Sequence, residues 1–230
     1  MKHPKSFLLL LYFGLLISCT KEDSSLNDIK NPDLTDIDGN GYKAVNIGTQ
    51  TWLQQNLNVS HYNNGEIIPQ VTNATDWNNL KTGAWCYYEN DTNKGKTYGK
   101  LYNWYAVNDP RGLAPKGYKI PNKNDWDVLI SYLGGESIAG GKMKSTNLWH
   151  SPNTGGTNNS GFSASPGGQY TYSAFSYVGD DGFWWSATTV EGTDNYANSI
   201  LLTFVDENVQ TSWDIKKDGL SVRCIKEITP

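Results

Sequence analysis

The stretch "GLAPKGYKIPNKNDWDVL" (residues 112–129) contains the clearest secondary-structure signal in the 230-residue chain. Asn122 is a suitable helix N-cap, and Asp125 stands three residues further on, at the spacing of a capping box. Apolar side chains then recur at i, i+3, i+4 and i+7: Trp126, Leu129, Ile130 and Leu133. Two glycines follow directly, which is a common way for a helix to end. The spacing predicts a helix over Asn122–Leu133.

The segments before this helix predict strands and one further helix. Asp38–Gly41 ("DGNG") is a turn signal, and the alternating residues Tyr42–Ile47 predict a strand after it. A second short strand is predicted at Thr51–Leu53. In Thr97–Val107 ("TYGKLYNWYAV"), aromatic and apolar residues gather on one helical face, which predicts a second helix.

The segments after the helix predict a long loop region followed by strands. Residues 145–182 are rich in Gly, Ser and Asn, which is typical of irregular structure. Four short strands are expected beyond it: Phe183–Thr188, Ser199–Val205, Val209–Ile215 and Leu220–Lys226. Strands, two helices, long irregular loops and then strands make an α+β fold with short antiparallel strands, since no βαβα alternation is present.

The N-terminus has the pattern of a secretory signal. Lys2 and Lys5 precede an apolar run, Phe7–Ile17, of 11 residues, whereas a spanning helix needs about 20. The run ends at Cys19, which resembles a bacterial lipobox, so residues 1–18 are predicted to be a signal peptide and Cys19 a lipid anchor. The alternative is an ordinary signal peptide in which Cys19 is incidental.

The residues behind Cys19 predict a tether and a location. Residues 19–34 are polar and poor in aromatics, as in a flexible linker. Within them, Lys21-Glu22-Asp23 resembles the export signals of surface-displayed lipoproteins, while a merely solvated tether is the alternative. We expect the protein at the outer membrane, facing the cell exterior, with residues 35–230 as a single domain.

Charge and cysteine content restrict the function classes. Without Lys2 and Lys5, 17 of the 19 basic residues remain against 23 acidic ones, and this acidic balance argues against a nucleic-acid partner. Apart from Cys19, the chain has Cys86 and Cys224, an even pair for an oxidising compartment. We expect a disulfide between them, with two separate reduced thiols as the alternative.

Six sequence blocks together resemble the Fibrobacter succinogenes major paralogous (FISUMP) domain, over about residues 36–226. They are "DIDGNGYKAVNIGTQTWLQQNL" (36–57), "YGKLYNWYAV" (98–107), "GLAPKGYKIPNKNDWDVL" (112–129), "SGFSASPGG" (160–168), "FWWSATT" (183–189) and "GLSVRCI" (219–225). The resemblance implies a secreted or surface lipoprotein domain with a C-type lectin-like fold, and it brings no catalytic residues. Ala114 stands where some members have cysteine, which leaves Cys86 as the remaining partner for Cys224.

Motifs for metal or cofactor chemistry are weak. The pattern Asp36-x-Asp38-x-Asn40-Gly41 matches the first half of an EF-hand loop, but position twelve is Ile47 where the bidentate Glu is required. His61 and His150, the histidines after the signal segment, lack partners at zinc-ligand spacing. We therefore expect no metal site, no cofactor and no catalytic residue.

Aromatic residues in and beside the long loop region are the better candidates for ligand binding. Exposed rings stack on sugars, and loops on a rigid scaffold often carry function. The candidates are Trp149, His150, Tyr170, Tyr172 and Trp185. The alternative is that these rings attach the loops to the core. The sequence thus predicts a surface lipoprotein that binds a glycan or a protein partner without catalysis. The alternatives are an envelope-bound polysaccharide-acting enzyme and a structural surface protein.

Overall fold

The computed structural model of the protein describes Met1 and residues 31–228. Most of the predicted signal peptide, the predicted anchor Cys19 and most of the predicted tether (19–34) lie outside the described residues. Hydrogen bonds to the rest of the fold are present from Asn31 onward: its carbonyl accepts from the Lys43 ammonium, and the Asp33 amide donates to the Tyr42 carbonyl at 2.9 Å. The expected α+β class is confirmed, and sheet outweighs helix.

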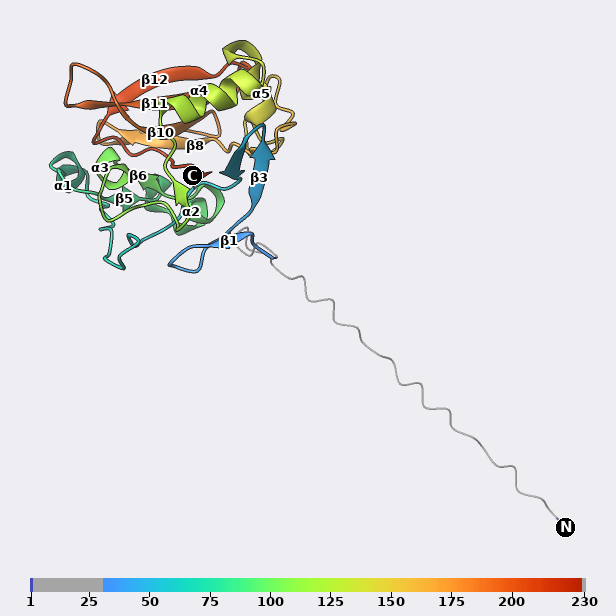
Figure 1. The fold of residues 1–230 in the computed structure, drawn as a ribbon. Coiled ribbons are helices and arrows are strands. Elements are labelled where there is room, and N and C mark those ends of the chain that lie inside the picture. The colour runs from blue at the N-terminus through green and yellow to red at the C-terminus, as the bar shows by residue number, and fades with distance from the viewer. Residues whose placement is uncertain (2–30, 229–230) are drawn as a thin grey trace.

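A five-stranded sheet forms the larger layer of the molecule (Figure 1). In spatial order its strands are β12 (Gln210–Ile215), β11 (Tyr196–Thr203), β10 (Asp181–Thr189), β8 (Gly167–Thr171) and β9 (Ala174–Val178). Neighbours are antiparallel except for β10 and β8, which meet in parallel at one pair of residues, Gly182 and Gly168. The predicted C-terminal strands therefore pair as a meander, β10–β11–β12.

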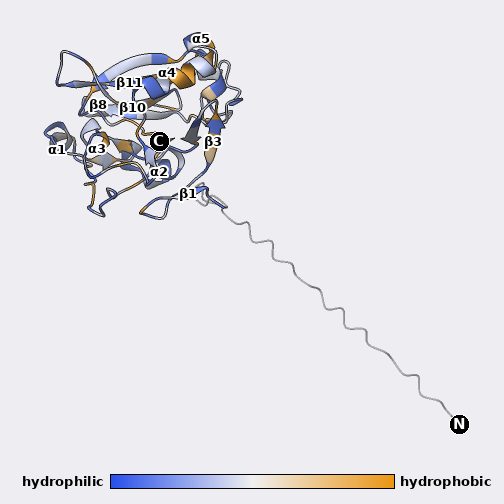
Figure 2. Ribbon diagram, in the orientation of Figure 1, coloured by the Kyte–Doolittle hydropathy of each residue, from blue (hydrophilic) through white to orange (hydrophobic). Residues whose placement is uncertain are grey.

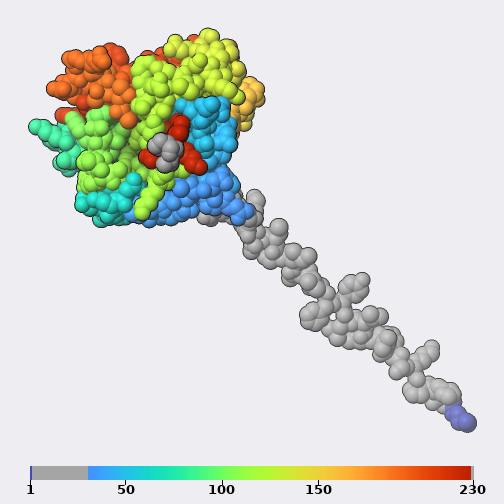
Figure 3. All heavy atoms as spheres, viewed as in Figure 1, coloured from blue at the N-terminus to red at the C-terminus, as the bar shows by residue number. Residues whose placement is uncertain are grey.

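A four-stranded antiparallel sheet joins segments from distant parts of the chain. Its order is β3 (Ala44–Ile47), β4 (Gln50–Leu53), β13 (Ile225–Lys226) and β7 (Tyr118–Lys119). Ile225 pairs with Trp52 on one side and with Lys119 on the other. Figure 3 shows the red C-terminal residues between the blue N-terminal strands and the green segment. The last strand thus closes the domain against the first ones.

Two further two-stranded sheets complete the β structure: β1 (Leu34–Thr35) with β2 (Gly41–Tyr42), and β5 (Trp85–Cys86) with β6 (Leu101–Tyr102). The turn between β1 and β2 is the predicted one. Asp36 Oδ1 accepts hydrogen bonds from the amides of Asp38 and Asn40, at 2.9 and 3.0 Å. The carboxylate of this EF-hand-like motif is therefore used to hold its own turn.

Helix α4 (Lys123–Tyr132) confirms the strongest prediction from the sequence. Asn122 and Asp125 form the capping box in both directions, and the apolar face is buried. Gly134 and Gly135 end the helix with φ angles of 104° and 93°, a conformation that glycine adopts without strain. Figure 2 shows apolar positions alternating with polar ones along α4, and α5 (Glu136–Met143) follows it.

The predicted helix over Thr97–Val107 is wrong. The segment contains the end of α2 (Thr92–Tyr98), then β6, then α3 (Trp104–Val107). Gly99, at φ 78°, ends α2, and Asn103 caps α3 by accepting from the Ala106 amide at 3.1 Å. Between them Tyr102 pairs with Leu220, so tertiary pairing overrides the helical periodicity. With α1 (Ala74–Asn78) and a 3-10 turn at Tyr88–Asn90, the described residues contain five α-helices where two were expected.

The prediction of an irregular region over residues 145–182 is also corrected. Its second half forms the hairpin β8–β9, with Thr171 paired to Ala174 across a two-residue turn. Tyr172 and Ser173 both have positive φ, as a tight hairpin turn requires. Conversely, the strand expected at Leu220–Lys226 is regular only at β13, and Leu220 and Ser221 form isolated bridges.

Aromatic side chains fill much of the core, as the composition suggests. Trp52 packs on Trp126 and Phe162, with ring centroids 4.8 and 5.5 Å apart, in the cluster beneath α4 and α5. A second cluster, around Tyr102 and Trp185, lies between the two larger sheets and the α3 region, and a third surrounds Trp77. Burial of these rings compensates for the small amount of long helix.

Candidate functional site

Three of the five predicted ligand-binding residues are core anchors. Trp149 and Trp185 are buried, and their indole N–H groups donate to the carbonyls of Ala164 (2.9 Å) and Tyr102 (2.7 Å). Tyr170 is buried against Trp77 in an edge-to-face contact with centroids 5.2 Å apart. Since these faces are covered by protein, the rings cannot serve as a stacking surface for a ligand.

The other two candidates are exposed but do not meet. Tyr172 is 83% exposed at the turn of the β8–β9 hairpin. His150 lies at the opposite end, where its amide donates to Gly179 at 2.7 Å and its Nδ1 lies 2.9 Å from Asp180 Oδ1. The hairpin register puts four residue steps, about 13 Å, between its two ends. The predicted aromatic platform is therefore not assembled.

The predicted disulfide is absent, because Cys86 and Cys224 are both free and buried. Cys86 belongs to the cluster around Trp77, whereas Cys224 belongs to the cluster around Tyr102 and Trp185. Burial raises the pKa of both thiols above the ordinary value. The alternative of two separate reduced thiols describes the structure.

The residues that the structure describes contain no group of three or more His, Cys, Asp and Glu side chains arranged to hold a metal ion. His61 instead contacts the Asp38 carboxylate at the surface, and hydrogen bonds from His61 and the Ser60 amide lower the pKa of Asp38 against the opposing effect of its burial.

Among residues 31–228, no helix is long and apolar enough to cross a membrane.

A polar cleft of about 320 Å³ is one of two concave sites of similar volume in the described part of the chain, and it is the one lined by the larger set of polar side chains. Its wall comes from the start of β2, the segment after β4, helix α2, the segment after α5 and the loop before β8. Seven carboxamide side chains line it: Asn40, Gln54, Gln55, Asn56, Asn58, Asn147 and Asn158. Five serine and threonine side chains join them: Thr97, Ser145, Thr146, Ser163 and Ser165. We call this site the amide cleft.

Some of the carboxamides hold the wall of the amide cleft together. Asn56 donates to the Tyr98 carbonyl at 2.9 Å and accepts from Trp184 Nε1 at 2.8 Å, and it is buried. Asn158 accepts from the Ser163 amide at 2.8 Å and donates to its hydroxyl at 3.0 Å. These bonds join α2, β10 and the loop before β8 into one rigid surface.

Two other carboxamides keep hydrogen-bonding capacity for a ligand. Gln55 uses its Oε1 to accept from the Lys43 amide at 2.8 Å, while within residues 31–228 its Nε2 has no partner. The exposed Asn147 side chain likewise has no hydrogen bond to the rest of the described chain. Asn58 Oδ1 also lacks a partner among the described residues, but it is buried away from the open cleft. An unpaired polar atom in a cleft wall costs stability unless a ligand or water completes it.

Arg223 lies directly behind the floor of the amide cleft and is fully buried. Its Nη1 donates to the carbonyls of Leu53 (2.9 Å), Gln54 (2.6 Å) and Phe162 (2.6 Å). Its Nη2 donates to Asn56 Oδ1 at 3.0 Å. Burial lowers the pKa of Arg223, but a guanidinium keeps its proton in proteins, so these oxygens solvate a cation.

Reasoning from the sequence missed the amide cleft. The signal that could have found part of it is "QQNLN" (54–58), which places four carboxamides within five residues directly after a predicted strand. Asn40–Tyr42 come from the predicted turn and strand just before it, but the other wall residues come from segments about 40 to 110 positions away, and no local pattern joins them to the cleft.

Comparison with known proteins gives one family. The model of the Fibrobacter succinogenes major domain matches residues 45–226, which is most of the chain. No curated protein and no solved structure matches the chain. The matched region contains helix α4, the five-stranded sheet and the last strand, β13. It also includes most of the lining of the amide cleft. The chain therefore belongs to the Fibrobacter succinogenes major domain family, as its sequence blocks predict.

Proposed function

We propose that this protein is a binding module that takes a glycan into the amide cleft without transforming it. The observation that carries the proposal is the chemistry of the lining, in which carboxamides and hydroxyls predominate and two side chains, Gln55 and Asn147, keep unused donors or acceptors. Sugar hydroxyls both donate and accept hydrogen bonds, and a carboxamide offers both functions on one side chain. A few such groups in a preformed concave site provide orientation and specificity.

The same lining argues for binding over catalysis. No Asp, Glu, His or Cys lines the amide cleft among the described residues. Glycoside hydrolysis needs two carboxyl groups on either side of the scissile bond, and general acid–base catalysis needs a group that titrates near the working pH. The amide cleft can therefore hold a sugar, but it lacks the groups that would cleave one.

A protein partner is the second candidate, and it is favoured by one observation. Trp213 lies on β12, an edge strand of the larger sheet, and its side chain is 61% exposed. The Tyr196 ring supports it edge-to-face at 5.0 Å. Exposed tryptophans on rigid elements are enriched at protein interfaces.

We also propose that the protein is lipid-anchored through Cys19 at the outer membrane and faces the exterior, and that the domain is C-type lectin-like. The signal pattern ending at Cys19 supports the anchor. Two features support the fold proposal: Pro121 directly precedes Asn122, the N-cap of α4, and the segment leading to Cys224 lies in the core beside β4.

The test is a binding screen of the purified full chain against a broad polysaccharide panel. A polyoxyethylene detergent is used because it carries no sugar. We expect retention on at least one polysaccharide and no released sugar in the supernatant. Asn147→Ala, which removes an exposed side chain of the cleft, should weaken retention, whereas Asn195→Ala at the far turn should not. Release of sugar, or equal retention of both variants, would contradict the proposal.

A further inference from the structure

We infer that the glycan taken by the amide cleft is acidic, carrying carboxylates such as those of uronate sugars. The inference rests on the proposed function and adds the ligand's charge to it. Its basis is a local excess of buried and exposed cations at the cleft of a chain whose formal net charge is −4.

The lining itself carries one charge. Lys96, in the last turn of α2, is the sole ionisable side chain of Lys, Arg, Asp or Glu type among the described lining residues, and it is exposed. No carboxylate lines the amide cleft to neutralise it. Within residues 31–228, Lys96 forms no ion pair, so its ammonium is available to a ligand.

The floor adds a second positive charge. Arg223 touches three lining residues through the Gln54 carbonyl, Asn56 Oδ1 and the Ser163 carbonyl. Within the described residues, it is fully buried and forms no ion pair, so carbonyl and amide dipoles alone solvate it. A buried charge without a counter-ion is weakly screened, and its field extends into the adjoining cleft.

Arg223 and Lys96 both adjoin the part of the wall formed by Asn56 and helix α2. Asn56 joins their surroundings, because it donates to the Tyr98 carbonyl in α2 and accepts from Arg223. The part of the wall near the β1–β2 turn carries less net charge, because a lysine and a carboxylate both contact it. There, Lys100 donates to the Asn58 carbonyl, and the Asp36 carboxylate accepts from Tyr42 and Asn40. A ligand carboxylate is therefore expected beside α2 and not beside the β1–β2 turn.

The positive charges of Arg223 and Lys96 are expected to discriminate between acidic and neutral sugars more than they raise the affinity for sugars in general. Neutral hydroxyls can still pair with the carboxamides, while a carboxylate gains the attraction of two cations. A neutral sugar would leave Arg223 uncompensated, as it is in the unliganded protein. The predicted preference is therefore a charge preference within one sugar skeleton.

The experiment compares uronate oligosaccharides with their methyl esters, which have the same skeleton without the charge. Oligomers of galacturonate, glucuronate and mannuronate are titrated into the full chain by calorimetry. For the skeleton that binds, we expect the acid to bind about tenfold more tightly than the ester at about 20 mM salt. The ratio should fall several-fold at about 500 mM salt, where the screening length is only a few ångströms.

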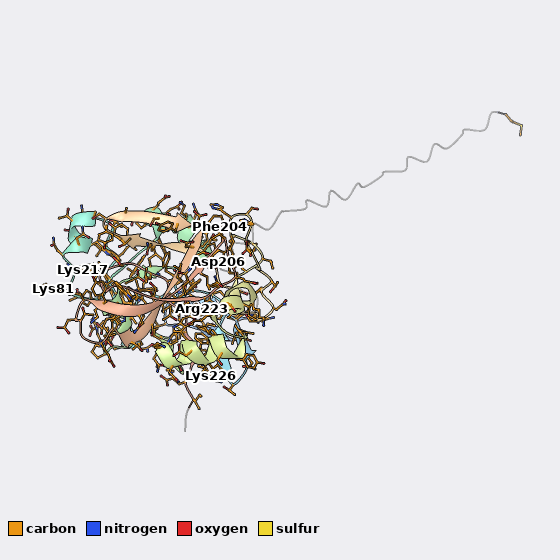
Figure 4. All side chains as sticks on the ribbon, turned by 90° about the horizontal axis from the view of Figure 1, so that it is seen from above. Lys81, Phe204, Asp206, Lys217, Arg223 and Lys226 are labelled. Atoms are coloured by element: carbon orange, nitrogen blue, oxygen red, sulfur yellow. The ribbon has the colours of Figure 1, made fainter. Side chains whose placement is uncertain are left out.

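Matched lysine variants test the location. Lys96→Gln should reduce the acid-to-ester ratio by about two- to fivefold, as expected for one exposed charge, and Lys96→Arg should keep it. Lys81→Gln should leave the ratio unchanged. Figure 4 shows Lys81 at the edge of the molecule, well apart from Arg223.

Three outcomes would overturn the inference, and they separate it from the proposed function. Equal binding of acid and ester, or binding of neutral polysaccharides alone, would refute an acidic ligand and leave the glycan module standing. Equal effects of Lys81→Gln and Lys96→Gln would refute the location. If no uronate and no neutral polysaccharide binds, the proposed function itself is refuted.

Discussion

Two buried cations, Lys144 and Arg223, are held in nearly the same way but lie in different regions. Each is fully buried, and each is solvated mainly by backbone carbonyls. Lys144 Nζ donates to the carbonyls of Thr154, Thr203 and Asp206 at 2.6–2.8 Å. Burial lowers its pKa, and the carboxylates of Asp206 and Glu207 oppose that shift.

The difference lies in what surrounds each cation. Lys144 attaches the loop after α5 to β11, and the nearby carboxylates of Asp206 and Glu207 partly offset the cost of burying its charge. Arg223 attaches the segment after β4 to the loop before β8. Its positive charge is stabilised by carbonyl and amide oxygens and not by a carboxylate. The same arrangement, a buried cation surrounded by carbonyls, therefore has two uses. At Lys144 it stabilises the fold, whereas at Arg223 it stabilises the fold and also places a positive charge behind the amide cleft.

The largest expected effect is the loss of either cation. Arg223→Met and Lys144→Met should each lower the free energy of unfolding by about 3–5 kcal/mol, because several buried carbonyls lose their donor. Urea unfolding followed by tryptophan fluorescence measures this. Lys81→Met is the control, and a surface change of this kind should stay within about 0.5 kcal/mol. A cost for Arg223→Met no larger than the control would remove its structural role.

The next effect concerns the ring beside Lys144. The ammonium lies 5.4 Å from the centroid of Trp149, whose indole is buried. Trp149→Ala should lower the free energy of unfolding by about 3 kcal/mol through the cavity it leaves. Tyr172→Ala, at an exposed turn, should change it by less than about 0.5 kcal/mol. Thermal unfolding of both variants decides the matter, and similar costs would contradict the division into core anchor and surface ring.

A buried anion sharpens the comparison through its pH dependence. Burial raises the pKa of Asp218 to about 6, Asp214 adds to this, and a hydrogen bond from Thr171 opposes it. The folded state therefore holds a proton that the unfolded state has lost, and stability from this group falls as pH rises from about 4 to 6. Asp218→Asn should raise the free energy of unfolding above pH 6 by about 2 kcal/mol and reduce that slope, leaving the part contributed by Asp181, whose pKa burial also raises to about 6.

Urea midpoints measured between pH 4 and pH 8 test the Asp218 prediction. Asp194→Asn, at an exposed turn, is the matched control and should leave the slope unchanged. An undiminished slope in Asp218→Asn would assign the whole of it to other groups, such as Asp181.

The smallest expected effect is that of a reducing agent. Because Cys86 and Cys224 are separate thiols, reduction should change the free energy of unfolding by less than about 0.5 kcal/mol. A disulfide closing so long a loop would add up to about 4–5 kcal/mol in the chain-entropy model. Unfolding with and without reductant, together with thiol counting under denaturing conditions, gives the answer. A large loss on reduction would show that the two cysteines pair.

The parts of the fold that sequence reasoning found are those specified by neighbouring residues. The capping box and stop glycines of α4 act within a few residues, and the strands β10 and β11 are apolar enough to be recognised locally. The hairpin β8–β9 escaped because its strands are rich in Gly, Ser and Tyr and its faces depend on neighbours far along the chain. The single helix expected at Thr97–Val107 failed for the related reason that Tyr102 pairs with Leu220.

By itself, the sequence determined the family, the α+β class, helix α4 and the acidic balance, because each depends on composition or on local spacing. Only the tertiary structure decided which aromatics are buried, whether the cysteines meet, and where the amide cleft lies. These outcomes depend on contacts between residues more than a hundred positions apart, as between Arg223 and Gln54. Trp149 and Tyr172 look alike as sequence candidates, and packing alone makes the first an anchor and leaves the second at the surface.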